Sequence, residues 1–459
     1  MINATQPARV PLFVYVALLI CFAGGTAQAS TVQVGMCKPT LAHFSSIQAA
    51  VNASTVGGIV YVCPGTYAEQ VTIAKSLQLL GVAGGVNSTP TVIPPTSGLV
   101  QNGSDIFGSP VAAQIFVSNA GGNVVISGLT VDGTGNNLAG CTAPTLEGIY
   151  YQNTSGTITD DAVRNQFQTD YASYGGCQNG LAINVEAVTS TNTVTISANS
   201  VRAYQKNGIT ATGAGTGAGS PGPSVTILNN YIVGLAANAM IWQTPGAAEN
   251  GVQIGFGATG KVNDNTVLDN IWPSDTNTDT GDAASGILIF ASSGITVTGN
   301  AVGSAQFGIV ADTDSYGFCT NGTATISCGP ADNTTITANH VVGTAIFDAI
   351  EACSNHNTIQ SNTIFGSTES AIHIDDTCTN TTLSTTSGNN NSVSKNIINE
   401  ACAAILTGTG TGNSITTAGT YNVTNNAMSG DVCLAGGTAA KLAAQSKKLK
   451  PAPYRPTRK

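Results

Sequence analysis

The residues best suited to chemistry are acids and a histidine that follow repeated Gly-Ile or Ala-Ile steps. Aligned on these steps, Glu351 and His373 take one position, and Asp312 and Asp375 take the position two residues further on. Alternate residues of a strand share a face, and neighbouring strands lie about 4.8 Å apart. We therefore expect Glu351 beside His373 and favouring its protonated form, with Asp312 and Asp375 about 9 to 10 Å apart.

Paired carboxyl groups at such a distance suit glycoside hydrolysis, in which one acts as acid and the other as base or nucleophile. Asp376 adds a further acid at the strand end. The candidate catalytic residues are thus Asp312, Glu351, His373, Asp375 and Asp376. The alternative interpretation is an outward-facing acidic surface without catalysis.

A second group of oxygen-bearing side chains alternates along one segment, as in calcium-binding loops. It consists of Asp275, Asn277, Asp279 and Asp282. Gly281 of this segment lies one position later than the glycine of an EF-hand loop, and no glutamate follows at the end of the loop. Calcium is the one cofactor that the sequence suggests, and an ordinary polar loop is the alternative.

The elements that position these residues follow from a repeat of an aliphatic residue, asparagine three positions later and another aliphatic residue two positions after that. The segments VTISANSV and TIQSNTIF are examples. The repeated asparagines are Asn199, Asn230, Asn265, Asn300, Asn339, Asn362 and Asn396. Repeats of this size indicate a solenoid, whose coils bury their apolar faces only by stacking.

Short Val/Ile/Thr runs with alternating polarity predict strands, and strands repeated in one direction pair in parallel. The fold class is therefore all-β, a right-handed parallel β-helix of about ten coils. The asparagines can take left-handed backbone angles at the turns and can bond to one another as a ladder. A low-complexity Thr/Asn-rich chain is the alternative interpretation.

The N-terminal residues predict export. The apolar segment VPLFVYVALLICF after Arg9 and the small residues Ala27 and Ala29 are typical of a signal peptide and its cleavage site. We expect a signal peptide at 1–29, a β-helix domain at 30–436, and a basic, disordered tail at 437–459. No other segment is apolar enough to span a bilayer, so the predicted location is extracellular or periplasmic.

Ten cysteines remain after removal of such a peptide, and in an exported chain they favour disulfides. Pairing of neighbours in sequence is plausible, and Cys319–Cys328 is the best candidate for a local bridge.

Charge argues against nucleic acid as a partner. Residues 30–440 hold all 24 acidic side chains and only seven basic ones, a net charge of −17. Such a body repels a phosphate backbone.

The N-terminal segment FSSIQAAVNASTVGGIVYVCPGTYAEQVTIAKSLQLLG, residues 44–81, resembles the opening of pectin methylesterases and other β-helix proteins of the pectate-lyase-like superfamily. Ser45 or Ser46 caps a predicted helix that covers the open end of the stack with Phe44, Ile47 and Val51. The resemblance implies the fold. The catalytic motifs of pectin methylesterases, polygalacturonases and pectate lyases are not found as sets in this sequence.

Two functions remain open. The chain is a carbohydrate-active protein that binds or processes a polysaccharide along the side of the helix, or a non-catalytic, adhesin-like surface protein. A polysaccharide is the expected partner. Converging Asp, Glu and His side chains would favour the first function, and a flat Ser/Thr/Asn face would favour the second.

Overall fold

The computed structural model describes most of the chain. The described residues are 29–85, 88–170, 177–189, 191–215, 222–235, 249–271, 282–313, 329–344, 347–367, 369–378, 386–416, 421–425 and 450–451.

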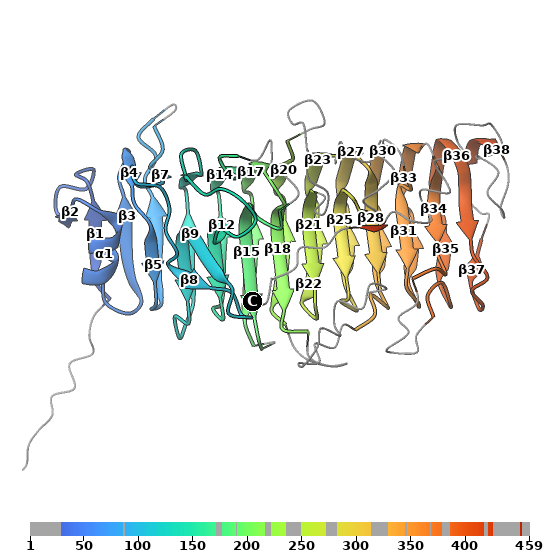
Figure 1. Ribbon diagram of the computed structural model, residues 1–459, viewed down its shortest axis with the longest axis horizontal. Coiled ribbons are helices and arrows are strands. Elements are labelled where there is room, and N and C mark those ends of the chain that lie inside the picture. Colours follow the sequence, from blue (N-terminus) through green and yellow to red (C-terminus); the bar gives the residue numbers. More distant parts are fainter. Residues whose placement is uncertain are drawn as a thin grey trace, which may run out of the picture.

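The described residues form a parallel β-helix, seen side-on in Figure 1. One 14-stranded sheet, the long sheet, runs along it. Its strands in spatial order are β2 (Ala42–Phe44), β1 (Thr31–Val34), β3 (Gly58–Val62), β6 (Leu77–Gly81), β10 (Val124–Ser127), β13 (Gly156–Thr159), β16 (Thr193–Ser197), β19 (Ser224–Leu228), β22 (Thr259–Asn263), β26 (Thr296–Thr298), β29 (Thr335–Thr337), β32 (Thr358–Gln360), β35 (Ser392–Ser394) and β37 (Ser414–Ile415).

The other strands form two parallel rows joined into one sheet. The middle row, which follows the long sheet in each coil, contains β4 (Thr66–Ala68), β7 (Thr91–Ile93), β11 (Thr130–Asp132), β14 (Ala162–Gln166), β17 (Ser200–Tyr204), β20 (Tyr231–Val233), β23 (Thr266–Asn270), β27 (Ala301–Ala305), β30 (His340–Thr344) and β33 (Thr363–Ser367). The site row contains β5 (Val71–Ile73), β9 (Pro110–Ser118), β12 (Thr145–Gln152), β15 (Leu181–Ala187), β18 (Asn207–Gly213), β21 (Asn250–Gly255), β25 (Ser285–Phe290), β28 (Phe307–Asp312), β31 (Ile350–Cys353) and β34 (Ser370–Ile374). β36 (Ile397–Thr407) passes through both rows and pairs with β38 (Tyr421–Asn425).

The fold class is as predicted, although about ten coils was too few. The long sheet also includes β1 and β2, which precede the predicted N-terminal helix. Other short strands are β8 (Gly103–Ser104), β24 (Asp282–Ala283) and β39 (Lys450–Pro451), the last of which lies within the predicted tail and pairs with β24.

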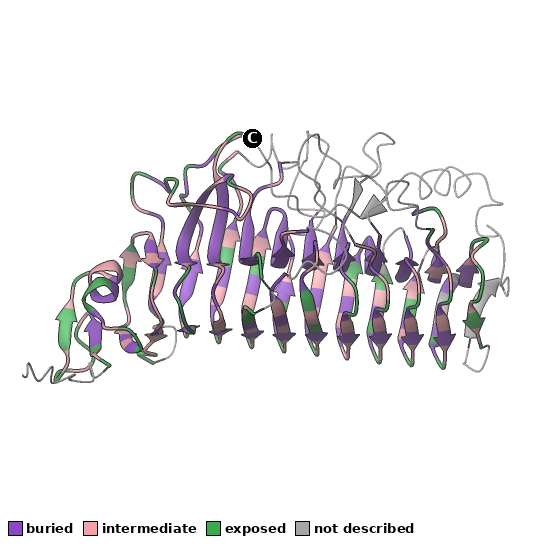
Figure 2. Ribbon diagram, turned by 90° about the horizontal axis from the view of Figure 1, so that it is seen from below, coloured by how far each residue is buried: buried purple, intermediate pink, exposed green. Residues whose placement is uncertain are grey.

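The core is built from columns of β-branched side chains that repeat from coil to coil. Ile126 is in register with Ile158, Ile158 with Ile196, and Ile196 with Ile227, and all four are fully buried. Figure 2 shows buried residues in every coil along the length of the stack. A branched side chain packs well on a pleated surface, so the repeat in the sequence becomes a continuous apolar interior.

A helix covers the N-terminal end of this interior, as the sequence predicts. Helix α1 (Ile47–Ala53) is capped by Ser46, whose hydroxyl accepts a hydrogen bond from the Ala49 amide. Ile47 and Val51 are buried, and Phe44 packs against the same core.

The asparagine ladder is confirmed. In the centre of the stack, the Asn339 side-chain oxygen accepts hydrogen bonds from the backbone and side-chain nitrogens of Asn300. The Asn339 side-chain nitrogen donates to Asn362 of the next coil and to the Val297 carbonyl. The same pattern joins all seven repeated asparagines.

The expectation that these asparagines take left-handed backbone angles was wrong. The positive φ angle belongs to the residue before the asparagine, such as Ala198, Ala338 or Ser361. The ladder explains the difference, because a buried asparagine must direct its side chain into the stack. The chain therefore turns one residue earlier.

Three disulfides join neighbours in sequence, as predicted: Cys37–Cys63, Cys141–Cys177 and Cys353–Cys378. Cys319 and Cys328 lie outside the described residues, as do the proposed signal peptide up to residue 28 and the calcium candidates Asp275, Asn277 and Asp279. Asp282 is described only as the first residue of β24. Among the described residues, no helix is long and apolar enough to cross a membrane.

One acid replaces asparagine at the N-terminal end of the ladder. Asp161 accepts from the Leu129 amide and donates its own amide to Asn199, but its Oδ2 is buried without a partner. In the next coil, the equivalent Asn199 nitrogen donates to the Ile158 carbonyl. Burial raises the pKa of Asp161 well above its ordinary value and so favours the protonated form of its carboxyl group.

We expect Asp161→Asn to stabilise the fold by about 1 to 3 kcal/mol at pH 7, because the amide supplies a donor without holding a proton. A carboxyl whose folded pKa is raised contributes stability at low pH and loses it as pH rises toward the folded pKa. The advantage of the variant should therefore grow from about pH 4 upward in denaturant unfolding. If the stability difference between Asp161→Asn and the wild type were the same at pH 4 and pH 7, the raised pKa of Asp161 would be contradicted.

Removing a central ladder amide should destabilise the fold. Asn339→Leu leaves groups of Asn300, Asn362 and Val297 without their partner, at a cost of about 1 to 3 kcal/mol. Gln360→Leu, on the outer side of the long sheet, is the matched control and should change little. Unchanged thermal unfolding of Asn339→Leu would count against a stabilising ladder.

Candidate functional site

The candidate site lies on the outer face of the site row, and small residues set its position. A side chain on Gly308 would meet the Ala349 carbonyl at 2.3 Å and the Val341 side chain at 2.6 Å. Glycine is therefore required at position 308, and alanine takes the equivalent positions 349 and 371 of the next two coils. In each coil the next residue is a buried isoleucine, and the one after that points away from the core. The sequence alignment is confirmed, since Val310 is in register with Glu351, and Glu351 with His373.

The nearest partner of His373 is Asp348. Its Nδ1 lies 2.9 Å from Asp348 Oδ2, and the other Asp348 oxygen accepts from the amide and hydroxyl of Ser370. Burial alone would lower the pKa of His373, but the Asp348 charge and hydrogen bond, with smaller effects of Asp375 and Glu351, raise it to about 10. The site therefore contains an imidazolium at neutral pH, still partly exposed, with 26% of its side-chain surface accessible.

Glu351 is the most unusual group of the site. It is only 6% exposed, and no described residue makes a hydrogen bond to its carboxyl group. Burial, followed by the charges of Asp375 and Asp348, raises its pKa well above the ordinary value, and His373 opposes the rise only in part. Burial therefore favours the protonated form of the Glu351 carboxyl group.

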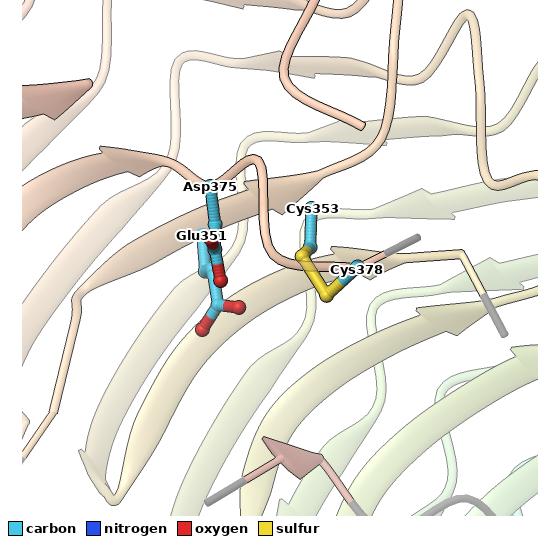
Figure 3. A group of neighbouring side chains, drawn as sticks. All are labelled: Glu351, Cys353, Asp375 and Cys378. Atoms are coloured by element: carbon cyan, nitrogen blue, oxygen red, sulfur yellow. A yellow bond between two sulfur atoms is a disulfide. The ribbon is translucent and has the colours of Figure 1, made fainter. Parts of the chain in front are cut away.

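Asp375 faces Glu351 at close range. The ligand atoms of Glu351, Asp375, Cys353 and Cys378 all lie within 4.8 Å of one another (Figure 3). Asp375 is held by the amide and hydroxyl of Thr377, at 2.8 Å each, and the Cys353–Cys378 disulfide ties this turn to β31. Because the two sulfur atoms are bonded to each other, the group offers two carboxyl groups and no thiolate for a metal.

The remaining predicted residues lie at the edges of the cluster. Asp312 is fully buried, in register with Cys353, and its charge adds to the rise in the Glu351 pKa. Asp376 is bound to the hydroxyl and amide of Thr409, which lower its pKa. Asp376 therefore links successive coils. The two carboxyl groups that lie close together are those of Glu351 and Asp375.

Sequence reasoning missed Asp348. It sits just before the Ala349-Ile350 step and is paired through space with Ser370, which precedes the next step. Alignment of that preceding position as well would have shown an acid beside Ser370 and one coil away from His373.

No protein-family model and no curated protein matches the chain. The likeness of its N-terminal segment to pectin methylesterases therefore has no support from them.

Solved structures are similar in fold. A Dettilon tailspike protein matches with a TM-score of 0.50 and 14% identity over 80% of this chain and 62% of the tailspike chain. A GH136 lacto-N-biosidase from Eubacterium ramulus matches with a TM-score of 0.51 and 10% identity over 86% of this chain and 68% of that chain. The catalytic domain of a GH87 alpha-1,3-glucanase, solved with nigerose, matches at 0.47 and 14% identity over 88% and 67%. At these identities, the matches to the tailspike and the lacto-N-biosidase show the parallel β-helix fold alone.

We expect His373 to stay protonated up to about pH 10, and Asp348→Asn to lower its pKa by about 1 to 3 pH units through loss of the adjacent charge. Histidine-ring NMR follows this titration, and His373→Gln assigns the signal. The control Asp132→Asn removes a different acid, which pairs with Arg164, and should leave His373 unchanged. Titration of wild-type His373 near pH 6.5 would contradict the ion pair.

Proposed function

We propose that the outer face of the site row binds a polysaccharide and cleaves a glycosidic bond. The observation that carries the proposal is the buried Glu351 carboxyl group, which accepts no hydrogen bond from the described residues and lies within 4.8 Å of Asp375. Glycoside hydrolysis requires such a pair: a neutral acid to protonate the leaving oxygen and a carboxylate to act at the sugar carbon. The partly exposed imidazolium of His373 can donate a hydrogen bond to a sugar oxygen.

The distance between the two carboxyl groups suggests the stereochemical course. Carboxyl groups about 5 to 5.5 Å apart are typical of retaining enzymes, and those about 6.5 to 9.5 Å apart of inverting ones. The carboxyl oxygens of Glu351 and Asp375 lie within 4.8 Å of each other, which fits the shorter distance of retaining enzymes. We therefore infer retention of configuration with Asp375 as nucleophile, in place of the wider Asp312–Asp375 pair expected from the sequence.

A non-catalytic surface protein is the second candidate, and the long sheet favours it. Its outer face carries hydroxyl side chains in register, such as Thr296, Thr335 and Thr358. A rod with such a face can serve as a scaffold without any reaction at the site row.

Screening the purified protein against plant and microbial polysaccharides tests the proposal. We expect turnover of at least one, with Glu351→Gln and Asp375→Asn each lowering kcat by about 10² to 10⁴ while leaving substrate binding intact. Asp160→Asn, which changes an exposed acid far along the chain, is the control and should keep full activity.

Each result has a distinct meaning. Polysaccharide binding without turnover in the wild type would indicate a binding module and not an enzyme. Wild-type activity in both site variants would exclude this pair as the catalytic one, and failure to bind any polysaccharide would favour the scaffold.

A further inference from the structure

An apolar cluster lies on the outer face of the site row, next to the candidate site. Ile287 and Ile289 of β25 belong to the core inside the coils. Leu288 and Phe290 alternate with them and therefore point outward, yet both are fully buried. In β28, Val310 is in register with Leu288 and is equally buried. Outward-facing apolar residues of this kind need a cover from outside the coils.

Aromatic side chains extend this group. Phe256, which follows β21, packs edge-to-face on Phe290 with ring centroids 5.5 Å apart. Phe307 at the start of β28 stacks on Phe347 at 4.9 Å. All four rings are at most 6% exposed. The whole group, the outer apolar cluster, contains Phe256, Leu288, Phe290, Ala291, Phe307, Val310 and Phe347.

The C-terminal segment of the chain returns to this cluster. β39 pairs in parallel with β24, the short strand that comes directly before β25. It also lies against β28. In Figure 1, this strand, coloured red, lies beside β28 in the middle of the stack and not at the last coil. The end of the chain is therefore held on the face that carries the outer apolar cluster.

The chain between β38 and β39 is long enough for this return. Four strand spacings, about 19 Å, separate the site-row part of β36 from β25. The 24 residues from 426 to 449 can span about 80 Å when they are extended. Pairing of β39 with β24 is therefore compatible with the position of the last coil.

Charge favours the same placement. Residues 441–459 hold seven basic side chains and no acid, whereas residues 30–440 carry a net charge of −17. In the pairing of β39 with β24, a lysine, Lys450, is the register partner of an acid, Asp282. A basic segment of the same chain suits this face better than a second copy, because the body of a second copy carries the same excess of negative charge.

We propose that residues 441–459 form a strap that docks beside β24, on the outer face of β25 and β28, and covers the outer apolar cluster. Val310 of this cluster is in register with Glu351, so the strap borders the candidate site on its N-terminal side. A polysaccharide that follows the site row from Glu351 toward β25 must displace the strap. This consequence rests on the proposed function, whereas the docking itself does not.

Hydrogen exchange of the full chain and of a chain that ends at residue 440 tests the docking. We expect the β24 amides to exchange roughly tenfold faster without the strap, because β24 loses its partner strand. A full-length chain with residues 441–459 in scrambled order should show the same increase. β16, in the long sheet, is the control and should exchange equally in all three chains, which also verifies that the variants fold. Equal exchange of β24 in all three would overturn the strap.

A synthetic peptide of residues 441–459 gives the second readout. It should bind the truncated chain, restore the slow exchange of β24 and bind less tightly as the salt concentration rises. A peptide of the same residues in scrambled order has the same charge and is the matched control. Equal binding of the two peptides would indicate charge attraction without a docked strand and would overturn the proposal, as would failure of the native peptide to bind.

Binding of a polysaccharide found in the screen separates the strap from the proposed function. The truncated chain should bind it more tightly than the full chain, because no strap has to be displaced. Equal binding would refute the displacement, while the exchange of β24 decides the docking. A screen without any ligand would count against the proposed function and leave the result for the docking unchanged.

Discussion

The structure depends on one constraint: each coil must place the same kind of residue in register with the equivalent residue of the neighbouring coils. Parallel pairing at about 4.8 Å keeps this register, so an error in one coil would move apolar side chains out of the core. The isoleucine columns and the asparagine ladder enforce it in two ways. The isoleucine columns stabilise the correct register through burial of apolar side chains. The ladder makes a shifted register unfavourable, because a displaced Asn339 would leave buried amide groups unpaired.

The ladder has a backbone cost. Ala198, Ala338 and Ser361 adopt left-handed angles, which cost about 1 to 2 kcal/mol for residues other than glycine. Each such turn directs the next asparagine into the stack, where it makes several buried hydrogen bonds. The turn and the ladder thus stabilise one another, and neither residue alone explains the repeat.

The same register builds the site. Gly308, Ala349 and Ala371 take equivalent positions in successive coils, and the strands then present Val310, Glu351 and His373 in one column. Because coils repeat, residues distant in sequence meet at strand spacing, and the Cys353–Cys378 disulfide holds the Asp375 turn against its neighbour. Buried acids are costly, so their concentration on one face indicates selection for something other than stability.

Much of this was predictable from the sequence, for identifiable reasons. The Asn and Ala-Ile repeats set the coil register, so the pairing of Glu351 with His373 followed from their spacing. The helix cap over Ile47 followed from a capping serine and the apolar residues of the N-terminal segment. Other features depended on positions and segments that lie outside the aligned repeats. Asp348 lies one residue before the Ala349-Ile350 step, outside the positions that were aligned, and the β8–β9 hairpin that brings the Ile106 amide to Glu186 is not part of the repeat.

The central claim is that burial beside Asp375 and Asp348 holds the pKa of Glu351 well above its ordinary value, so that this carboxyl group serves as the acid of the site. The infrared difference spectrum between wild type and Glu351→Gln at pH 7 measures this directly, because only a protonated carboxyl group gives a carboxylic acid carbonyl band. A band present in the wild type and lost in the variant, persisting until the pH is raised well above 7, is the predicted result. A difference spectrum that contains only carboxylate bands at pH 7 would contradict the claim.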